Sequence, residues 1–188
     1  MNETAAKKNS GMSKLVFILF AISVITSLLL GLVNYITEGP IAESKAKKTT
    51  EAMFIVMPAD EYVTETYTGK DITVQSLSSA MSGGEQTGWV VGVSPSGFGG
   101  AIEMVVGVDK NYLVTGISII SMTETSGLGT NANKDEFKNQ FIAQGAGLAV
   151  NKDGGTIQAL TGATVTSRAV TNGVNSAVEA AMEAGGRK

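Results

Sequence analysis

The chain has 188 residues, a formal net charge of −3 at pH 7, and neither histidine nor cysteine. The weak acidic charge provides no basic field of the kind that attracts nucleic acid, so we expect no nucleic-acid partner. The missing residue types exclude Cys/His zinc sites, disulfides and catalysis by Ser-His-Asp or Cys-His groups. Any chemistry must therefore come from hydroxyls, carboxylates, backbone amides or a bound cofactor.

An apolar segment without a charged residue covers residues 15–37 and follows a polar stretch, 1–14, that contains three lysines. About 20 apolar residues, each rising 1.5 Å along a helix, cross a hydrocarbon core of roughly 30 Å. The segment is longer than the apolar part of a signal peptide and lacks the polar face of a surface helix. We expect a single transmembrane helix over 15–37, in contact with membrane lipid. The preceding lysines favour a cytoplasmic N-terminal tail over 1–14, even though lysines also follow the span.

Residues 38–60 are predicted to form a connecting helix. Pro40 suits the first turn of a helix, where the N–H that proline lacks would have no partner. A weakly amphipathic pattern of apolar residues follows, and Pro58 stops it. The mixed lysines and glutamates of this segment are interpreted as a solvated face.

From about residue 61 the sequence changes to strands and turns. Three β-rich runs are separated by the turn-like sequences SPSGFGG and DKNY. Their spacing predicts an antiparallel meander, with strands over 89–93, 101–108 and 113–120.

Two helices are predicted to flank this sheet. The first covers 134–144. The second has apolar residues that recur on one helical face between Val170 and Ala181, and a glycine pair ends it. Helices segregated from antiparallel strands predict one α+β domain over 61–188.

TGATVTS, residues 161–167, places four hydroxyl side chains where the last helix is expected to begin. A helix N-cap needs one hydroxyl, and a cap at Thr164 or Thr166 would explain the stretch without any ligand. The unpaired amides and the dipole of a helix start also favour a bound phosphate, which the small residues Gly162 and Ala163 would let approach closely. A threonine hydroxyl in contact with that phosphate can be esterified to it without a histidine. The residues alone leave both interpretations open.

TETSGLGT, residues 123–130, is a second candidate. Gly127 and Gly129 flank Leu128, a pattern that can turn backbone amides and one apolar side chain toward a flat ligand. An ordinary glycine loop explains the same pattern. Glu124 has no carboxylate partner at acid/base spacing, so we assign no catalytic residue, and we assign no metal ligand. The glycine-rich hairpin SPSGFGGAIEMVVGVD needs no function, and neither a dinucleotide fingerprint nor a P-loop is present.

Taken together and in this order, these segments resemble the G subunit of the Rnf ion-translocating electron-transport complex. The chain is similar, more distantly, to the C subunit of the sodium-translocating NADH:quinone reductase. The resemblance covers about residues 15–182 and rests on the apolar anchor and the sequences PIAESKAKKTTEAM, GFGGAIEMVVGVD, ETSGLG and LTGATVTS. It implies an FMN-binding domain on the outer, extracytoplasmic side of the membrane.

The resemblance also implies how the flavin is held. The FMN phosphate would be esterified to Thr164, the last residue of TGAT, by a dedicated flavin transferase, which makes the chain a flavoprotein and a phosphoprotein. Thr166 and Ser167 would then be left to cap the last helix. The other implied cofactor-binding residues form a flavin-contacting loop and a group around the phosphate. The loop residues are Glu124, Thr125, Gly127, Leu128 and Gly129, and the phosphate group consists of Thr161, Gly162, Ala163 and Val165.

The implied function is electron relay. The chain would pass electrons through its FMN inside a ferredoxin:NAD⁺ oxidoreductase complex that moves Na⁺ or H⁺, and it would not be a complete enzyme alone. Its partners would be the other membrane and peripheral subunits, in the cell (inner) membrane. Two alternatives stay open: the C subunit of the quinone reductase, and an anchored module that binds flavin non-covalently. A pilin is excluded because Val16 stands where pilins carry glutamate, five residues after Gly11.

Three positions depart from the family pattern. Ser126 stands in place of the usual proline of the loop, which implies a less rigid loop. Met122 occupies the place of a histidine that many members carry, so no histidine role can be transferred. Gln158 replaces an acidic residue three positions ahead of TGAT, which weakens the expectation of efficient flavin attachment.

Overall fold

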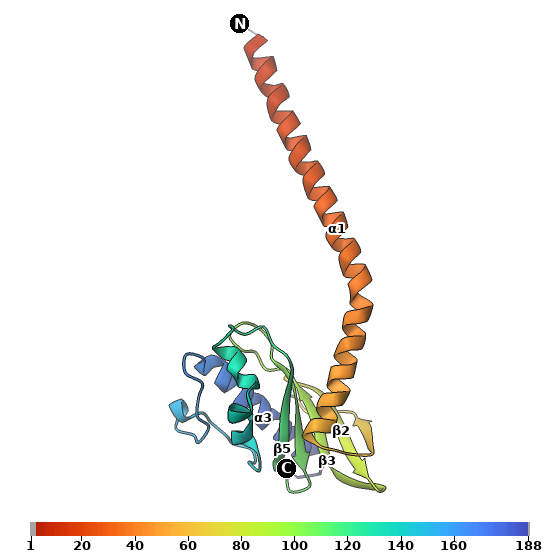
Figure 1. Ribbon diagram of the computed structural model, residues 1–188, viewed down its shortest axis with the longest axis vertical. Coiled ribbons are helices and arrows are strands. Elements are labelled where there is room, and N and C mark those ends of the chain that lie inside the picture. Colours follow the sequence, from red (N-terminus) through yellow and green to blue (C-terminus); the bar gives the residue numbers. More distant parts are fainter. Residues whose placement is uncertain (1–2, 188) are drawn as a thin grey trace. The chain divides into compact units, whose positions relative to one another are not determined.

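The computed structural model describes residues 3–187 (Figure 1). The chain divides into two compact units, Met1–Ala46 and Lys47–Lys188. Helix α1 covers Glu3–Val56. By length and composition, it is the one helix of the described chain that is apolar enough to cross a membrane. Its large apolar side chains in the first unit are exposed, as lipid-facing side chains would be, and the span 15–37 stays a prediction.

The predicted start of a separate helix at Pro40 is wrong, because α1 continues through Pro40 without interruption. A proline inside a helix removes one backbone hydrogen bond and crowds the carbonyl four residues earlier, and a local bend can absorb both effects. The stop expected at Pro58 is confirmed, since α1 ends at Val56. Helical backbone is disfavoured for the residue directly before a proline, here Met57, which explains why α1 ends at Val56.

Five strands form one antiparallel sheet in the order β1-β2-β3-β4-β5, so strands adjacent in the sequence are adjacent in the sheet. The predicted strands 89–93, 101–108 and 113–120 correspond to the last three, which confirms the meander and the α+β class. The strands are β1 Glu61–Glu65, β2 Val74–Ser82, β3 Glu85–Val93, β4 Glu103–Asp109 and β5 Val114–Ser121.

The sequence patterns did not predict β1 and β2 individually. β2 is rich in serine, which hides the usual alternation of apolar and polar residues. Its turn to β3 consists of Gly83 and Gly84, with φ of 60° and 82°. Positive φ at both central residues is typical of a type I′ hairpin turn, so this glycine pair was the available signal.

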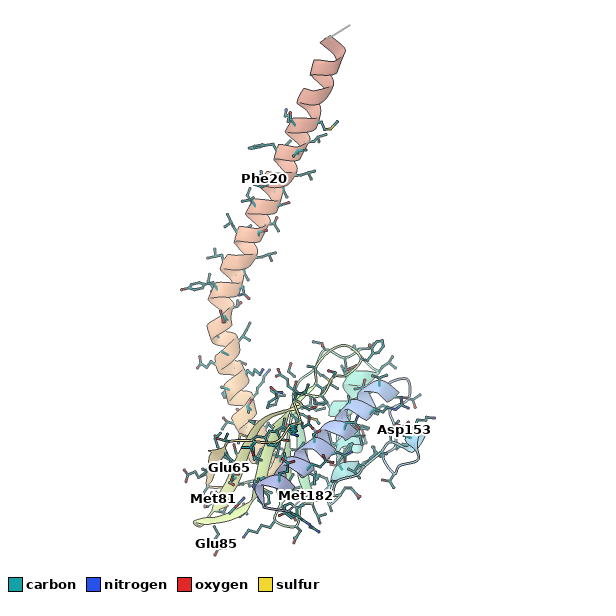
Figure 2. The ribbon with its side chains drawn as sticks, turned by 180° about the vertical axis from the view of Figure 1, so that it is seen from behind. Phe20, Glu65, Met81, Glu85, Asp153 and Met182 are labelled. Atoms are coloured by element: carbon teal, nitrogen blue, oxygen red, sulfur yellow. The ribbon has the colours of Figure 1, made fainter. Side chains whose placement is uncertain are left out.

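The sheet is covered on both faces. α3, Thr164–Ala184, packs against β2, β3 and β4, and it crosses the near face of the sheet in Figure 2. Side chains alternate between the two faces along a strand, so Val91 and Val106 lie in the core under α3 while Val90 and Val105 lie in a second core. The second core contains the last residues of α1, which belong to the same compact unit as the sheet. α3 ends before a glycine pair, as predicted.

The end of α1 lies on a strip of the sheet that has no side chains. Gly107 and Gly116 are paired across β4 and β5. A Cβ atom on Gly107 would come within 2.5 Å of the Val56 carbonyl oxygen, and one on Gly116 within 2.9 Å of the Val56 Cα. The Thr115 hydroxyl donates a hydrogen bond of 2.6 Å to the same carbonyl. The two glycines therefore make room for the helix end.

The predicted helix 134–144 is shorter than expected. α2 covers Asp135–Lys138 and continues as a 3-10 turn, η2, at Asn139–Phe141. The chain then leaves the helix to pair with the start of β5, where the Ala143 N–H donates to the Val114 carbonyl at 2.8 Å. The two further 3-10 turns of the described chain are η1 Gly129–Asn133 and η3 Asn151–Asp153.

Candidate functional site

A cavity of about 460 Å³ lies at the N-terminal end of α3. Three segments form its wall: the loop between β3 and β4, the loop after β5, and the start of α3. All the predicted cofactor-binding residues except Gly127 and Thr161 are in the lining, so the fold brings the two sequence motifs to one place. The lining residues are Phe98, Glu124, Thr125, Leu128, Gly129, Gly162, Ala163, Thr164, Val165 and Thr166.

The ETSGLG loop forms a compact turn that holds Leu128 in the cavity wall. Gly127 has a φ of 75°, a left-handed conformation that favours glycine. Its N–H donates to Thr130 Oγ1 at 2.9 Å. The N–H groups of Leu128 and Thr130 donate to the Thr125 carbonyl at 3.2 and 3.3 Å. Gly127 therefore shapes the loop although it lies outside the lining.

The TGAT motif forms the facing wall and the start of α3. Gly162 has a φ of 75°, and a Cβ atom there would come within 3.2 Å of Leu128 Cδ2, so glycine lets this turn approach the leucine closely. Ala163 is the N-cap of α3 and, among the described residues, no side chain makes a capping hydrogen bond to the helix start. The predicted cap at Thr164 or Thr166 is therefore wrong. Thr164 is already helical, and the Thr166 hydroxyl has another partner.

Two of the four hydroxyls of TGATVTS are buried and engaged. Thr166 is 1% exposed and donates to Glu124 Oε2 at 2.9 Å. Ser167 is buried, and its hydroxyl donates to the Ala163 carbonyl and accepts from the Leu160 N–H, each at 2.9 Å. The expectation that these two side chains cap α3 is corrected by these contacts, which join the helix to the segments beside it.

The other two hydroxyls are accessible. Thr161 is exposed and lies outside the cavity lining. Thr164 is half-buried and lines the cavity, and within the described chain its hydroxyl makes no hydrogen bond. A free hydroxyl beside the unpaired amides of a helix start suits a phosphate. Leu128 and Phe98 give the same cavity apolar surface for a flat group.

Glu124 connects the three segments of the cavity wall. Its Oε1 accepts from the backbone N–H groups of Phe98 at 2.7 Å and Gly99 at 3.2 Å, and its Oε2 accepts from Thr166. Only 8% of the residue is exposed. Sequence reasoning placed Glu124 among flavin-contacting residues, and it missed these partners because they are 25 to 42 residues away. The described residues contain no group of three side chains that could hold a metal ion.

Phe98 is a lining residue that sequence reasoning missed. It lies in the turn between β3 and β4, which a hydrogen bond of 2.7 Å from the Gly97 N–H to the Gly100 carbonyl closes. Its side chain is 73% exposed. An aromatic residue inside a glycine-rich loop was the available signal, because a large apolar side chain in such a loop gains little burial from its own fold.

Polar contacts hold the segment that precedes α3. Arg168, one helical turn after Thr164, donates two hydrogen bonds to Asp153, at 2.7 and 2.6 Å; Asp153 is labelled in Figure 2. These hydrogen bonds and the guanidinium charge hold the pKa of Asp153 below its ordinary value and raise the pKa of Arg168. The Gln158 side chain accepts a hydrogen bond of 2.9 Å from the Asn151 amide, outside the cavity lining.

Comparisons with known proteins agree with this geometry. A family model described as an FMN-binding domain matches residues 97–179, a range that includes every residue of the cavity lining. The chain is 39% identical over 160 residues to the G subunit of the proton-translocating ferredoxin:NAD(+) oxidoreductase complex of Clostridium ljungdahlii, covering 82% of this chain and 83% of the relative. It is 33% identical over 186 residues to the G subunit of the Na(+)-translocating complex of Acetobacterium woodii, covering 88% and 89%.

Among solved structures, the chain resembles the C subunit of the Na(+)-translocating NADH-quinone reductase of Parabacteroides distasonis. The TM-score is 0.59, and the match covers 79% of this chain and 96% of that chain. Sequence identity is 14%, so this likeness shows a shared fold.

Proposed function

The chain belongs to the family of G subunits of ion-translocating oxidoreductase complexes, and we propose that it is the FMN-carrying electron-relay subunit of such a complex. The two relatives are named for complexes that use ferredoxin and NAD⁺, and the proposal gives this chain's complex the same reaction. One relative is named for protons and the other for Na⁺, so the proposal includes either ion.

The cavity fits FMN in size and in chemistry. Its volume of about 460 Å³ falls within the roughly 300–1,000 Å³ of small-molecule sites. Leu128 and Phe98 offer apolar surface to a flat ring system, and the uncapped start of α3 offers amide donors to a phosphate. FMN supplies the electron transfer when it is bound, and the residues of the chain supply its position.

The flavin is proposed to be held by a phosphoester on Thr164. The observation that carries this is that, among the four hydroxyls of TGATVTS, the hydroxyl of Thr164 alone both lines the cavity and makes no hydrogen bond within the part of the chain that the structure describes. In the transfer, a bond forms between Thr164 Oγ1 and the phosphorus of an activated flavin donor, such as a flavin dinucleotide. The phosphoanhydride bond of the donor breaks, the nucleoside monophosphate leaves with the bonding electron pair, and the threonine proton passes to a base.

The cavity lining offers no free base for this transfer. The chain has no histidine, and the Glu124 carboxylate accepts three hydrogen bonds from other protein groups. The base is therefore assigned to a separate flavin transferase, which makes that enzyme a required partner. The role of Thr164 is then that of an acceptor held at the cavity wall by the first turn of α3.

The apolar helix α1 is proposed to keep this site beside the other subunits of the complex. A single membrane anchor confines the cofactor to a thin layer, which raises its effective concentration at membrane partners. The lysines of residues 1–14 support a cytoplasmic N-terminus and an extracytoplasmic flavin domain. The covalent bond would prevent loss of the flavin from an exposed domain.

The test is to produce the full chain together with a flavin transferase and to record its visible absorbance after denaturation and gel filtration. We expect flavin absorbance to stay with the denatured chain. Thr164→Val should remove it, and the matched variant Thr64→Val, at an exposed strand hydroxyl outside the cavity lining, should keep it. Flavin that separates on denaturation would indicate a non-covalent module and contradict the phosphoester. A colourless chain would contradict the flavin-binding function itself.

A further inference from the structure

We infer that Glu124 is a positioning residue. Its hydrogen bonds fix the distance between Thr164, where the flavin is attached, and the cavity wall at Phe98, against which the flavin lies. We call the hydrogen bonds that Glu124 accepts from Phe98, Gly99 and Thr166 the Glu124 lock. The inference rests on the proposed function, because it concerns the cavity assigned to FMN. Glu124 lies in the lining, but both of its carboxylate oxygens bind protein groups. Its contacts reach the loop between β3 and β4 on one side and α3 on the other.

The first half of this lock holds the Phe98 loop. Oε1 accepts the N–H groups of Phe98 and Gly99, at 2.7 and 3.2 Å. The backbone of this loop approaches so closely that a Cβ atom on Gly97 would collide with Oε1. The Thr123 hydroxyl, next to Glu124 in the sequence, adds a hydrogen bond of 3.0 Å to the Gly99 carbonyl. The loop is thus fixed by its backbone, which leaves the exposed Phe98 side chain free to contact a ligand.

The second half of the lock holds the first turn of α3. Oε2 accepts the hydroxyl of Thr166, which is 1% exposed and lies two residues after Thr164. A Cβ atom on Gly129 would come within 2.6 Å of Oε2 and 2.9 Å of Thr166 Oγ1, so glycine is needed for this approach. The same carboxylate therefore sets the spacing between the Thr164 attachment point and the Phe98 wall.

This spacing matters for a tethered flavin. The phosphate and the ring of FMN are at opposite ends of a flexible chain, so a phosphoester fixes one end only. The cavity wall at Phe98 orders the ring, and the hydrogen bonds to Glu124 hold this wall at a fixed distance from Thr164. Attachment itself depends on the TGAT hydroxyl and its transferase, so loss of the lock should leave the flavin attached but mobile.

The experiment uses the full chain, produced with a flavin transferase, in four variants: Glu124→Ala, Glu124→Gln, Thr166→Val and Thr166→Ser. A glutamine carbonyl can still accept from the Phe98 loop while its NH₂ donates to Thr166 Oγ1, and serine keeps the hydroxyl. Glu85→Gln, at an exposed hairpin residue, is the control. The readouts are intact mass, fluorescence anisotropy and visible circular dichroism of the flavin, and hydrogen exchange at the Phe98 and Gly99 amides.

We expect Glu124→Ala and Thr166→Val to retain the mass of attached FMN and to lose most of the visible circular dichroism and part of the anisotropy. Glu124→Gln and Thr166→Ser should restore both signals. In Glu124→Ala the Phe98 and Gly99 amides should exchange faster, with and without flavin. Should Glu124→Ala fail to fold, the Thr166 pair decides.

Two results would overturn the inference. One is a wild-type flavin signal in Glu124→Ala and Thr166→Val. The other is a glutamine variant as impaired as the alanine variant while its Phe98 and Gly99 amides stay protected, which would indicate that the charge of Glu124 acts on the flavin directly. A wild-type chain without flavin would contradict the proposed function, and the amide exchange would then still test the lock.

Discussion

Replacing Gly107 by alanine is expected to push the end of α1 away from the sheet. The new Cβ atom would collide with Thr115 Oγ1 and lie 2.5 Å from the Val56 carbonyl oxygen. The Val56 contact is with backbone, which cannot rotate away. The hydrogen bond of 2.6 Å that joins Thr115 to Val56 would be broken or stretched as the helix end moves.

The size of the effect follows from three contributions. Overpacking a well-packed contact costs roughly 1–3 kcal/mol. Loss of the Thr115 hydrogen bond adds about 0.5–1.5 kcal/mol. The lower entropy of an unfolded chain with alanine in place of glycine offsets about 0.4–1 kcal/mol. The free energy of unfolding should therefore fall by about 2 kcal/mol, which moves the urea midpoint by roughly 1 M for an m-value near 2 kcal/mol/M.

The assay is urea unfolding of the full chain in detergent, followed by the fluorescence of Trp89. Trp89 is the one tryptophan of the chain, and it is buried and stacked on Tyr112. Gly145→Ala is the matched control, because its Cβ would meet no atom closer than 3.9 Å, and its effect should stay within about 0.5 kcal/mol. Equal midpoints for Gly107→Ala and Gly145→Ala would refute the reasoning that glycine makes room for the helix end.

Three further predictions concern the cavity and its surroundings. Leu128→Ala and Ile142→Ala shorten apolar side chains that are 43% and 39% exposed, so both should lower the melting temperature by similar amounts. Only Leu128→Ala should change the visible spectrum of the flavin, because only Leu128 lines the cavity. Equal flavin spectra in the two variants would argue against contact between Leu128 and the flavin ring. Gly162→Ala places a Cβ atom at a φ of 75° and 3.2 Å from Leu128 Cδ2. It should lower the free energy of unfolding in urea by about 1–3 kcal/mol and reduce the fraction of chain that carries the mass of FMN. Unchanged flavin attachment would contradict the need for glycine at this position. Arg168 lowers the pKa of Asp153 below its ordinary value of 3.8, so the stability from this pair is present above pH 3.8 and is lost as the pH falls through the lower folded pKa. The melting temperatures of wild type and Asp153→Asn should therefore differ at neutral pH and converge in acid. A difference that stays constant with pH would show that the pair does not titrate as described.

Local sequence signals predicted the elements that have a regular apolar pattern and a clear turn or glycine boundary. α3 was found from its apolar periodicity and the glycine pair after Ala184, and the last three strands from β-rich runs between turns. The failures have physical causes as well. Pro40 was interpreted as a helix start because proline suits the first turn of a helix. The prediction failed because the cost of a proline inside a helix is finite, and α1 tolerates it. Serines in β2 hid the alternation by which strands are recognised.

The candidate site shows the same limit more sharply. The two motifs predicted which segments meet, and the structure brings them together at one cavity. The resemblance implied Thr164 as the acceptor, but the residues alone could not predict which hydroxyl is free. That depends on partners elsewhere in the chain, since Thr166 donates to Glu124 and Ser167 accepts from the Leu160 amide. An N-cap was the simplest local explanation of these hydroxyls, and tertiary contacts replaced it. Phe98 was missed because a glycine-rich hairpin explained its loop without a ligand, although an aromatic side chain in such a loop was an available signal.

The central claim is that one hydroxyl, that of Thr164, carries the flavin. Trypsin should cut after Lys152 and Arg168, so one peptide, 153–168, contains all four hydroxyls of TGATVTS. Fragmentation of this peptide by tandem mass spectrometry, after production of the chain with its flavin transferase, is the most direct test. We predict the mass of one FMN less one water on Thr164. The same added mass on Thr161, Thr166 or Ser167, or an unmodified peptide from a chain that was exposed to an active transferase, would contradict the claim.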